Sequence, residues 1–218
     1  MSKKNTQSPI GTLMYVMVSG QGKENYEGDG YEYQCCVDVP EKEAQPYIDE
    51  IEDFIEDNAP AGAERALNKK GEDARPYTYS DEDDTIEDGH VRFTFKTKTE
   101  FEDKKGNIKD TEVAILDANG NKVKLPEGKL IGNGSTGRSI GTMVIWSRGN
   151  RKKTEYGASL YLNKVQIKDF VAYEGEKVDA IEGGSFNGFD NELQPDEDDT
   201  PAERSNRRAR RSRRYLGL

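Results

Sequence analysis

The sequence predicts a mainly β fold: an antiparallel Greek-key β-barrel with one inserted amphipathic helix and a disordered C-terminal tail. At least six short segments are rich in strand-forming residues and are separated by turn residues, while only one segment has helical periodicity. The chain ends in a Gly-rich, then acidic, then Arg-rich stretch without an apolar period. Short strands joined by tight turns with a single helix fit a closed barrel better than a βαβ arrangement.

Two strands and the helix are predicted in the first 60 residues. The strands are GTLMYVMVS at 11–19 and YEYQCCVDV at 31–39, both rich in β-formers. The helix is predicted at about 44–58, with Pro46 in its first turn and Pro60 at its end. Its apolar face consists of residues that recur at helical spacing: Tyr47, Ile48, Ile51, Phe54 and Ile55.

The remaining strands follow a loop or weak helix at 60–76. Alternation in VRFTFKTKTEF at 91–101 predicts a strand whose Phe93 and Phe95 face the core, with Arg92, Thr94, Lys96 and Lys98 on the other face. The other expected elements of this meander are a turn at 102–110, a strand at 111–123 that ends in an Asn-Gly turn, a Gly/Ser loop at 132–139, and strands at 140–146 and 157–175.

Composition predicts a soluble, intracellular protein. No apolar run approaches the roughly 18 residues that span a bilayer, and the start MSKKNTQSPIG lacks the apolar stretch of a secretory signal. Residues 1–182 suffice for one domain, and residues 183–218 are expected to be the disordered tail. Cys35 and Cys36 are adjacent on a predicted strand, so their side chains point to opposite faces and are expected to stay reduced.

The net charge of −10 argues, taken alone, against nucleic-acid binding. The charges are, however, unevenly distributed along the chain. Acidic residues concentrate at 41–59, 81–88 and 190–203, whereas lysine and arginine gather at 92–109, 122–129, 138–168 and 204–214. A negative total is therefore compatible with a positively charged face on the later strands.

No catalytic, metal or cofactor site is expected. The segment from Gly132 to Ser139 has the spacing of a phosphate-binding loop, but a strand is predicted after it and not the helix that such a loop opens. The acidic run at 81–88 lacks the ligand spacing of a calcium loop, so a solvated charged loop is expected there. His90 is the only histidine, and no nucleophile elbow is present. The prediction is a protein that is not an enzyme.

Basic and aromatic residues interleave on the later strands, a combination that can neutralise phosphates and stack bases. If Leu160 and Leu162 face the core, Tyr161 between them faces outward. Trp146 cannot be assigned by periodicity, because both faces of IGTMVIW are apolar, so a core and a groove position both stay open. The candidate nucleic-acid-binding residues are Lys96, Lys98, Trp146, Arg148, Arg151, Lys152, Lys153, Tyr156, Tyr161 and Lys164.

A family resemblance runs through nearly all of residues 1–190. It is carried by the stretches MSKKNTQSPIGT, FTFKTKTEFEDKKGNIKDTEVAILDANGNKV, IGNGSTGRS and YGASLYLNKVQIKDFVAYEG. In their order, spacing and loop chemistry these stretches resemble the replication single-stranded DNA-binding proteins of tailed bacteriophages. That family has an oligonucleotide-binding (OB) barrel and an acidic C-terminal tail. The present chain departs from the family pattern at its end, where the acidic segment is followed by ERSNRRARRSRRYLGL.

The resemblance implies a sequence-independent protein that coats and protects template strands in DNA replication, recombination and repair, in the cytoplasm of the infected bacterial host. It also implies single-stranded DNA as the ligand and contacts with the phage DNA polymerase and helicase-primase through the acidic tail. A homodimer stays open, as does the preference between DNA and RNA. Two other functions stay open from the residues alone: a protein-interaction β-barrel with incidental nucleic-acid binding, and a metal-dependent nuclease that uses the carboxylates at 81–88.

Overall fold

The computed structural model describes residues 2–173, except residues 26, 27, 29, 69, 70, 104, 126–128, 151 and 152. The predicted tail at 183–218, with its acidic and Arg-rich segments, lies outside the described residues. Within them the mainly β fold with one helix is confirmed. That helix is neither long nor apolar enough to cross a membrane.

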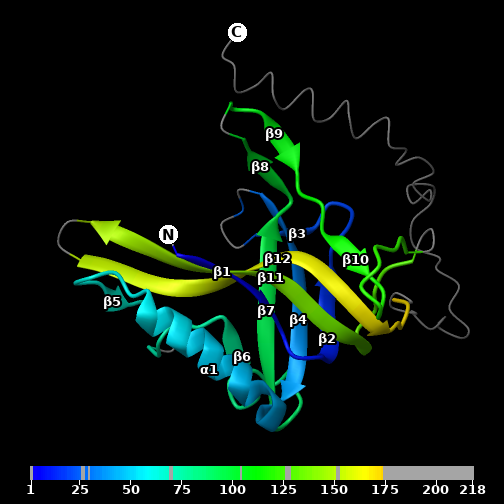
Figure 1. Ribbon diagram of the computed structural model, residues 1–218, viewed down its shortest axis with the longest axis horizontal. Helices are drawn as coiled ribbons and strands as arrows, with labels where there is room; N and C mark the ends of the chain where they lie inside the picture. The colour runs from blue at the N-terminus through cyan, green and yellow to red at the C-terminus, as the bar shows by residue number, and fades with distance from the viewer. Residues whose placement is uncertain are drawn as a thin grey trace, which may run out of the picture. The chain divides into compact units, whose positions relative to one another are not determined.

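Five strands form a closed ring around the core (Figure 1). They are β2 (Gly11–Met17), β4 (Tyr31–Pro40), β7 (His90–Lys98), β11 (Ser135–Asn150) and β12 (Lys153–Asp169). Their order is β2–β4–β7–β12–β11, and β11 pairs with β2 to close the ring. The predicted antiparallel pairing holds for four of the five neighbouring pairs in the ring, and the fifth pair, β7 and β12, runs parallel. A closed ring of five strands cannot alternate direction all the way round, so one neighbouring pair must be parallel.

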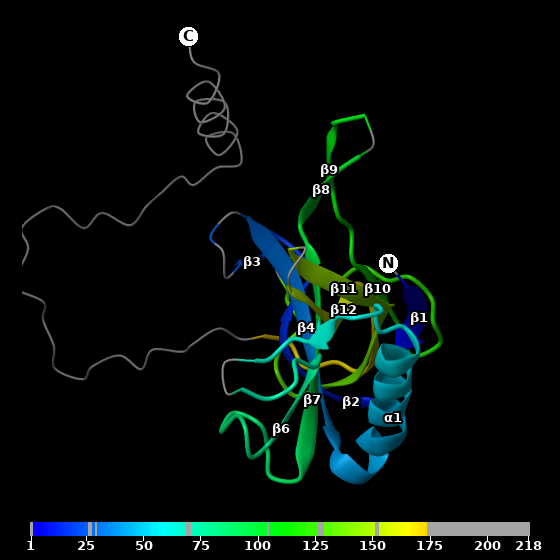
Figure 2. The same ribbon diagram turned by 90° about the vertical axis from the view of Figure 1, so that its left-hand side faces the viewer.

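Seven short strands accompany this ring, and five of them are joined to its sheet. β1 pairs with β11, β10 runs parallel to β12, and β8 and β9 form a separate hairpin that projects beyond the barrel in both views (Figure 1, Figure 2). The short strands are β1 (Lys3–Gln7), β3 (Lys23–Glu24), β5 (Glu64–Arg65), β6 (Tyr77–Tyr79), β8 (Glu100–Glu102), β9 (Ile108–Asp110) and β10 (Ala114–Leu116).

Strand pairing changes three of the predicted boundaries. The turn expected at 102–110 is shorter, because its last residues form β9 and pair with β8. The strand expected at 111–123 is reduced to β10, which pairs in parallel with β12 instead of continuing a meander. The loop expected at 132–139 ends at Ser135, where β11 already pairs with β2 on one side. In the last two cases a partner distant in sequence overrides the local turn chemistry.

The single helix α1 (Glu41–Asp57) confirms the predicted helix and begins three residues before it. The backbone N–H of Glu41 donates a hydrogen bond to the carbonyl of Gly89, which fixes this earlier start. Pro46 therefore lies in the second turn and not in the first. The buried face of α1 contains all five predicted apolar residues, and the Tyr47 ring packs edge-on against Phe93 with 4.9 Å between centroids.

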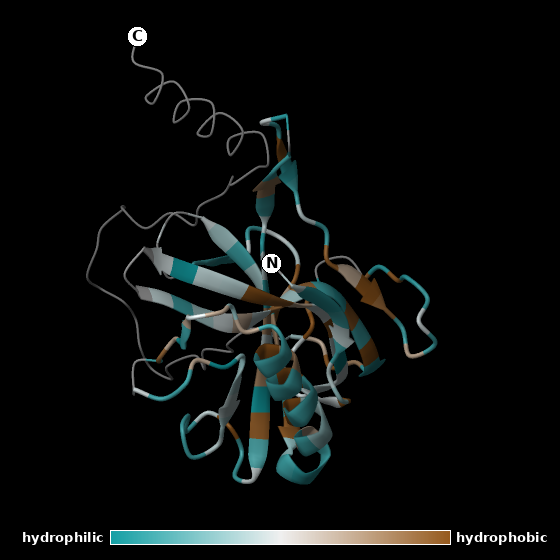
Figure 3. Ribbon diagram, turned by 60° about the vertical axis from the view of Figure 1, so that its left-hand side comes forward, coloured by the Kyte–Doolittle hydropathy of each residue, from teal (hydrophilic) through white to brown (hydrophobic). Residues whose placement is uncertain are grey.

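The barrel core follows the predicted alternation, which is visible as bands of colour along β7 (Figure 3). Phe93 and Phe95 are fully buried, and their register partners Val37 and Cys35 on β4 are buried with them. Cys36 points to the opposite face, and both thiols are free, as predicted. Burial raises the pKa of the Cys35 thiol to about 12, so this group stays protonated at neutral pH.

The β11–β12 hairpin is held against α1 by a short clamp. The loop expected at 60–76 contains β5, which pairs with β12 at Glu155 and Tyr156, close to the tip of this hairpin. Arg65 on β5 donates two hydrogen bonds to the Glu52 carboxylate on α1, at 2.6 and 3.0 Å, and the Tyr77 hydroxyl donates a third at 2.8 Å. Burial alone would raise the pKa of Glu52, but these bonds outweigh it and lower that pKa. The hairpin is thus fixed to the barrel by a charged contact.

Candidate nucleic-acid interface

The outer face of the barrel is formed by the side chains of β4, β7, β11 and β12 that point away from the core. Gln34 on β4 is opposite Lys96 on β7, and Lys96 is level with Tyr161 on β12. Their chain neighbours Cys35, Phe95 and Leu160 point into the core, so these three side chains point outward. The outward position predicted for Tyr161 is confirmed, with 46% of the residue exposed.

Trp146 shares this outer face. On β11, Trp146 is opposite Gly157 and Thr142 is opposite Tyr161, so these side chains lie on the same side of the sheet. The Trp146 ring is half-buried and lies against Gly157, where an added Cβ would come within 2.5 Å of it. The Arg148 guanidinium lies 5.4 Å from the ring centroid. The structure therefore places Trp146 on the same side of the sheet as Tyr161.

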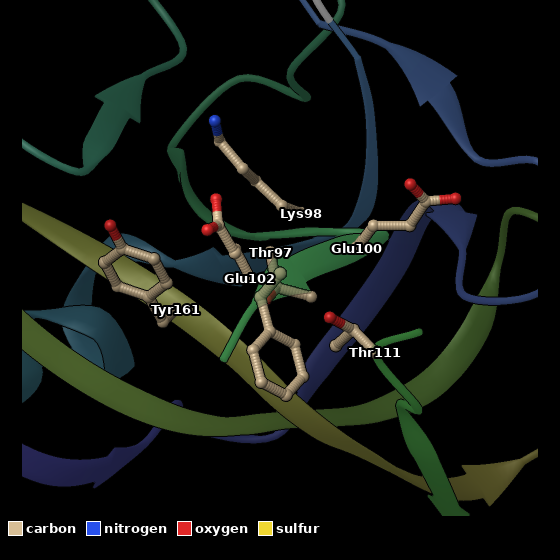
Figure 4. A pocket seen from close by; sticks show the side chains of 7 residues that line it. Thr97, Lys98, Glu100, Glu102, Thr111 and Tyr161 are labelled. Carbon is tan, nitrogen blue, oxygen red and sulfur yellow. The ribbon is translucent and has the colours of Figure 1, made fainter. Parts of the chain in front are cut away.

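An open groove of about 500 Å³ runs between β7, β12 and the β8–β9 hairpin (Figure 4). Tyr161 and Lys98 line it together with Phe101, which is 51% exposed. Phe101 is not among the site residues predicted from the sequence, because continued alternation from Phe93 and Phe95 would turn it toward the core. The strand instead ends at Lys98, and β8 leaves the barrel, so Phe101 lines the groove.

The predicted cations on the outer face are Lys96, Lys98, Arg148 and Lys164. Lys98 is opposite Glu32 in the β4–β7 register, and the Lys96 ammonium lies 2.7 Å from the Glu32 carboxylate. The pairing of β11 with β12 shifts its register between Leu162 and Lys164. This shift places the exposed side chain of Lys164 on the same side of β12 as the side chain of Asn163. Arg148 faces Glu155 at 3.4 Å. The face is therefore aromatic and cationic with acidic residues interspersed.

One of the four remaining predicted site residues is turned away from this face. Tyr156 points to the opposite side of β12, where it is half-buried and packs against the core. Arg151 and Lys152 lie outside the described residues. Lys153 begins β12 at the tip of the hairpin, opposite Asn150.

The acidic run at 81–88 is tied to the fold by arginines. Glu82 forms an ion pair with Arg75, and Asp83 lies 3.7 Å from Arg92. His90 contacts the backbone carbonyl of Asp88 through Nδ1 at 3.2 Å. Among the residues that the structure describes, no group of three or more His, Cys, Asp or Glu side chains could hold a metal ion.

Glu32→Gln is expected to strengthen the binding of a polyanion to the outer face by up to about fivefold at low salt, the equivalent of about 1 kcal/mol. The substitution frees Lys96 from its 2.7 Å ion pair and removes a repelling charge. The gain should disappear at high salt, because exposed charges are screened. Fluorescence anisotropy with a labelled oligonucleotide measures the affinity of the variant and of the wild type at both salt concentrations. Glu50→Gln, which breaks the 3.0 Å ion pair between Lys4 on β1 and Glu50 on α1, is the matched control, and an equal gain there would contradict the prediction.

The fold and the face together define the class of molecule: a five-stranded OB barrel that presents aromatic rings and cations on its outer face. The solved structure of gp2.5, a single-stranded DNA-binding protein encoded by bacteriophage T7, is similar with a TM-score of 0.55 and 23% identity, over 88% of this chain and 100% of that chain. The single-stranded DNA-binding protein of bacteriophage Enc34 in complex with ssDNA has a TM-score of 0.48 and 14% identity, over 78% of this chain and 88% of that chain.

The T7 protein is a phage single-stranded DNA-binding protein, the class that the sequence resemblance implied. No protein-family model matches the sequence, and no curated protein matches it. What the likeness to gp2.5 establishes is the shared fold, which extends over the whole of that protein's structure.

Proposed function

We propose that this protein binds single-stranded DNA without sequence preference and coats and protects template strands during phage DNA replication, recombination and repair. The observation that carries the proposal is the position of Tyr161 beside Lys96 on the outer face of the barrel. An aromatic ring can stack on any base, and an adjacent cation can neutralise the phosphate next to it. The name of the T7 structure, a single-stranded DNA-binding protein with the same fold, supports this assignment.

The proposed role requires binding and no chemical step. It has no cofactor, acts in the cytoplasm of the infected host, and uses the acidic segment at 190–203 to contact the phage polymerase and helicase-primase. Of the ten predicted site residues, Lys96, Lys98, Trp146, Arg148, Tyr161 and Lys164 form the proposed DNA path within the described part of the chain.

The affinity for single-stranded DNA is expected to fall steeply with salt and to change little with base sequence. Four cations on the outer face would release about four counterions, which gives a slope of log affinity against log salt of about −3. Titration of labelled oligonucleotides of several sequences in magnesium at four salt concentrations measures this slope. A slope near zero, or a strong preference for one sequence, would contradict this binding mode, and shortened products would indicate a nuclease.

The runner-up function is a protein-interaction module. It is favoured by exposed apolar side chains on Leu130, Phe170, Val171 and Tyr173, two of which are joined by a hydrogen bond from the Tyr173 N–H to the Leu130 carbonyl. Exposed apolar residues that gather in one place often mark an interface. In the same titration, absence of any binding to single-stranded DNA would favour this function.

A further inference from the structure

Tyr15 has a backbone conformation that is unusual for a residue with a side chain. It lies in a bulge of β2, between the pairing of Met14 with Cys36 and that of Met17 with Gln34. Its φ is 51°, and it is the only non-glycine residue with positive φ in the part of the chain that the structure describes. Bulky residues rarely adopt this left-handed conformation, which costs on the order of 1 kcal/mol or more.

Two contacts hold Tyr15 in this strained conformation. Its backbone N–H donates a 2.7 Å hydrogen bond to Oδ1 of Asn133, in the turn before β11. Its ring lies over the Arg92 guanidinium, 5.1 Å from the ring centroid. Strain of this kind persists where the surroundings enforce it, and it concentrates at functional sites.

Arg92 is an immobile support for the ring. Only 5% of the residue is exposed, and its guanidinium donates hydrogen bonds of 2.7 and 2.6 Å to Asp38 and of 2.7 and 3.0 Å to Thr85. Tyr15 itself is 43% exposed. The ring is thus fixed on one side by a buried cation and remains accessible to solvent. A ring that is already ordered loses little conformational entropy when a ligand stacks on it.

Tyr15 lies on the same outer face as Tyr161. Arg92 and Lys96 are on the same side of β7, and Lys96 is level with Tyr161 on β12. The backbone positions of Arg92 and Tyr161 are about 14 Å apart, from the rise along a strand and the spacing between strands. The two exposed rings therefore mark separate points along one continuous face.

We infer that Tyr15 is a second base-stacking platform for single-stranded DNA, held in place by its bulge, Asn133 and Arg92. The inference rests on the proposed function and extends it. The bound strand crosses the outer face from Tyr161 over β7 toward β2, so only an oligonucleotide that is long enough to cover this distance stacks on both rings. The unfavourable φ is retained because it orients the ring over Arg92.

Tyr15→Ala is expected to weaken binding of a long oligonucleotide by about 5- to 150-fold, the range for one lost stack. Tyr15→Phe should bind as the wild type does, because the ring is kept. The loss should become smaller as the oligonucleotide is shortened until it covers Tyr161 alone. Tyr31→Ala is the matched control, because Tyr31 is also exposed and its position in β4 alternates with the outward Glu32.

Tyr15→Gly separates the role of the ring from stability. Glycine accepts a positive φ without strain, so this variant should unfold at or above the denaturant midpoint of the wild type and still bind as weakly as Tyr15→Ala. Wild-type affinity in Tyr15→Ala or Tyr15→Gly would overturn the inference and leave the proposed function intact. Equal losses with short and long oligonucleotides would also overturn it. If the wild type binds no oligonucleotide, the proposed function fails as well.

Discussion

Arg92→Ala is expected to lower the free energy of unfolding by about 3–5 kcal/mol. The substitution leaves the Asp38 carboxylate, in a residue that is 7% exposed, without the two hydrogen bonds from Arg92 that compensate its burial. Chemical denaturation followed by circular dichroism measures the loss. It is a large fraction of the 5–15 kcal/mol by which domains are usually stable.

The double variant Arg92→Met with Asp38→Leu is the control for this prediction. When both charges are replaced by apolar side chains, no uncompensated charge stays buried, so most of the lost stability should return. The prediction would be wrong if Arg92→Ala cost less than about 1 kcal/mol, or if the double variant were less stable than the single one.

Joint replacement of Trp146 and Tyr161 by alanine is expected to lower the affinity for single-stranded DNA by about 2–6 kcal/mol, if the two lost stacks add. The free energy of unfolding should change far less from Tyr161→Ala than from a core substitution, because Tyr161 is exposed and borders an open groove. Trp146 is the only tryptophan, so quenching of its fluorescence by an oligonucleotide gives a direct signal in the wild type and in Tyr161→Ala.

Tyr173→Ala is the control for the stacking prediction. Tyr173 is also highly exposed but lies beside Leu130, outside the groove of Tyr161 and Lys98. The affinity of the Tyr173→Ala variant for single-stranded DNA should equal that of the wild type. Unchanged binding by the double variant, or a loss of equal size in Tyr173→Ala, would show that these rings are not stacking platforms.

Period-2 alternation predicted the core and part of the outer face from the sequence. It works for Tyr161 and for Phe93 and Phe95, because each lies in the middle of a strand with one buried and one exposed face. It fails where regular pairing stops: Tyr15 lies in a bulge, and Phe101 follows the end of β7. Both were missed as candidate site residues for that reason.

Trp146 shows a different limit of the pattern. Its strand is apolar on both faces: Ile145 is buried on the core side, and Val144, on the same side as Trp146, is buried as well. Only the register with β12, which places Trp146 opposite Gly157, decides its direction. Register depends on the fold as a whole, because a slip of one residue would exchange the two faces.

Pairing between the two ends of the barrel also determines when the chain can fold. The Ser8 hydroxyl accepts a hydrogen bond from the N–H of Ser139, 131 positions later, and β1 and β2 both pair with β11. Contacts between such distant parts must overcome the entropy of closing a long loop, which makes folding slow. During synthesis, β2 and the part of β7 at Phe95 and Lys96 lack their partners until β11 and β12 leave the ribosome, so the barrel completes only after nearly all of residues 1–169 are available.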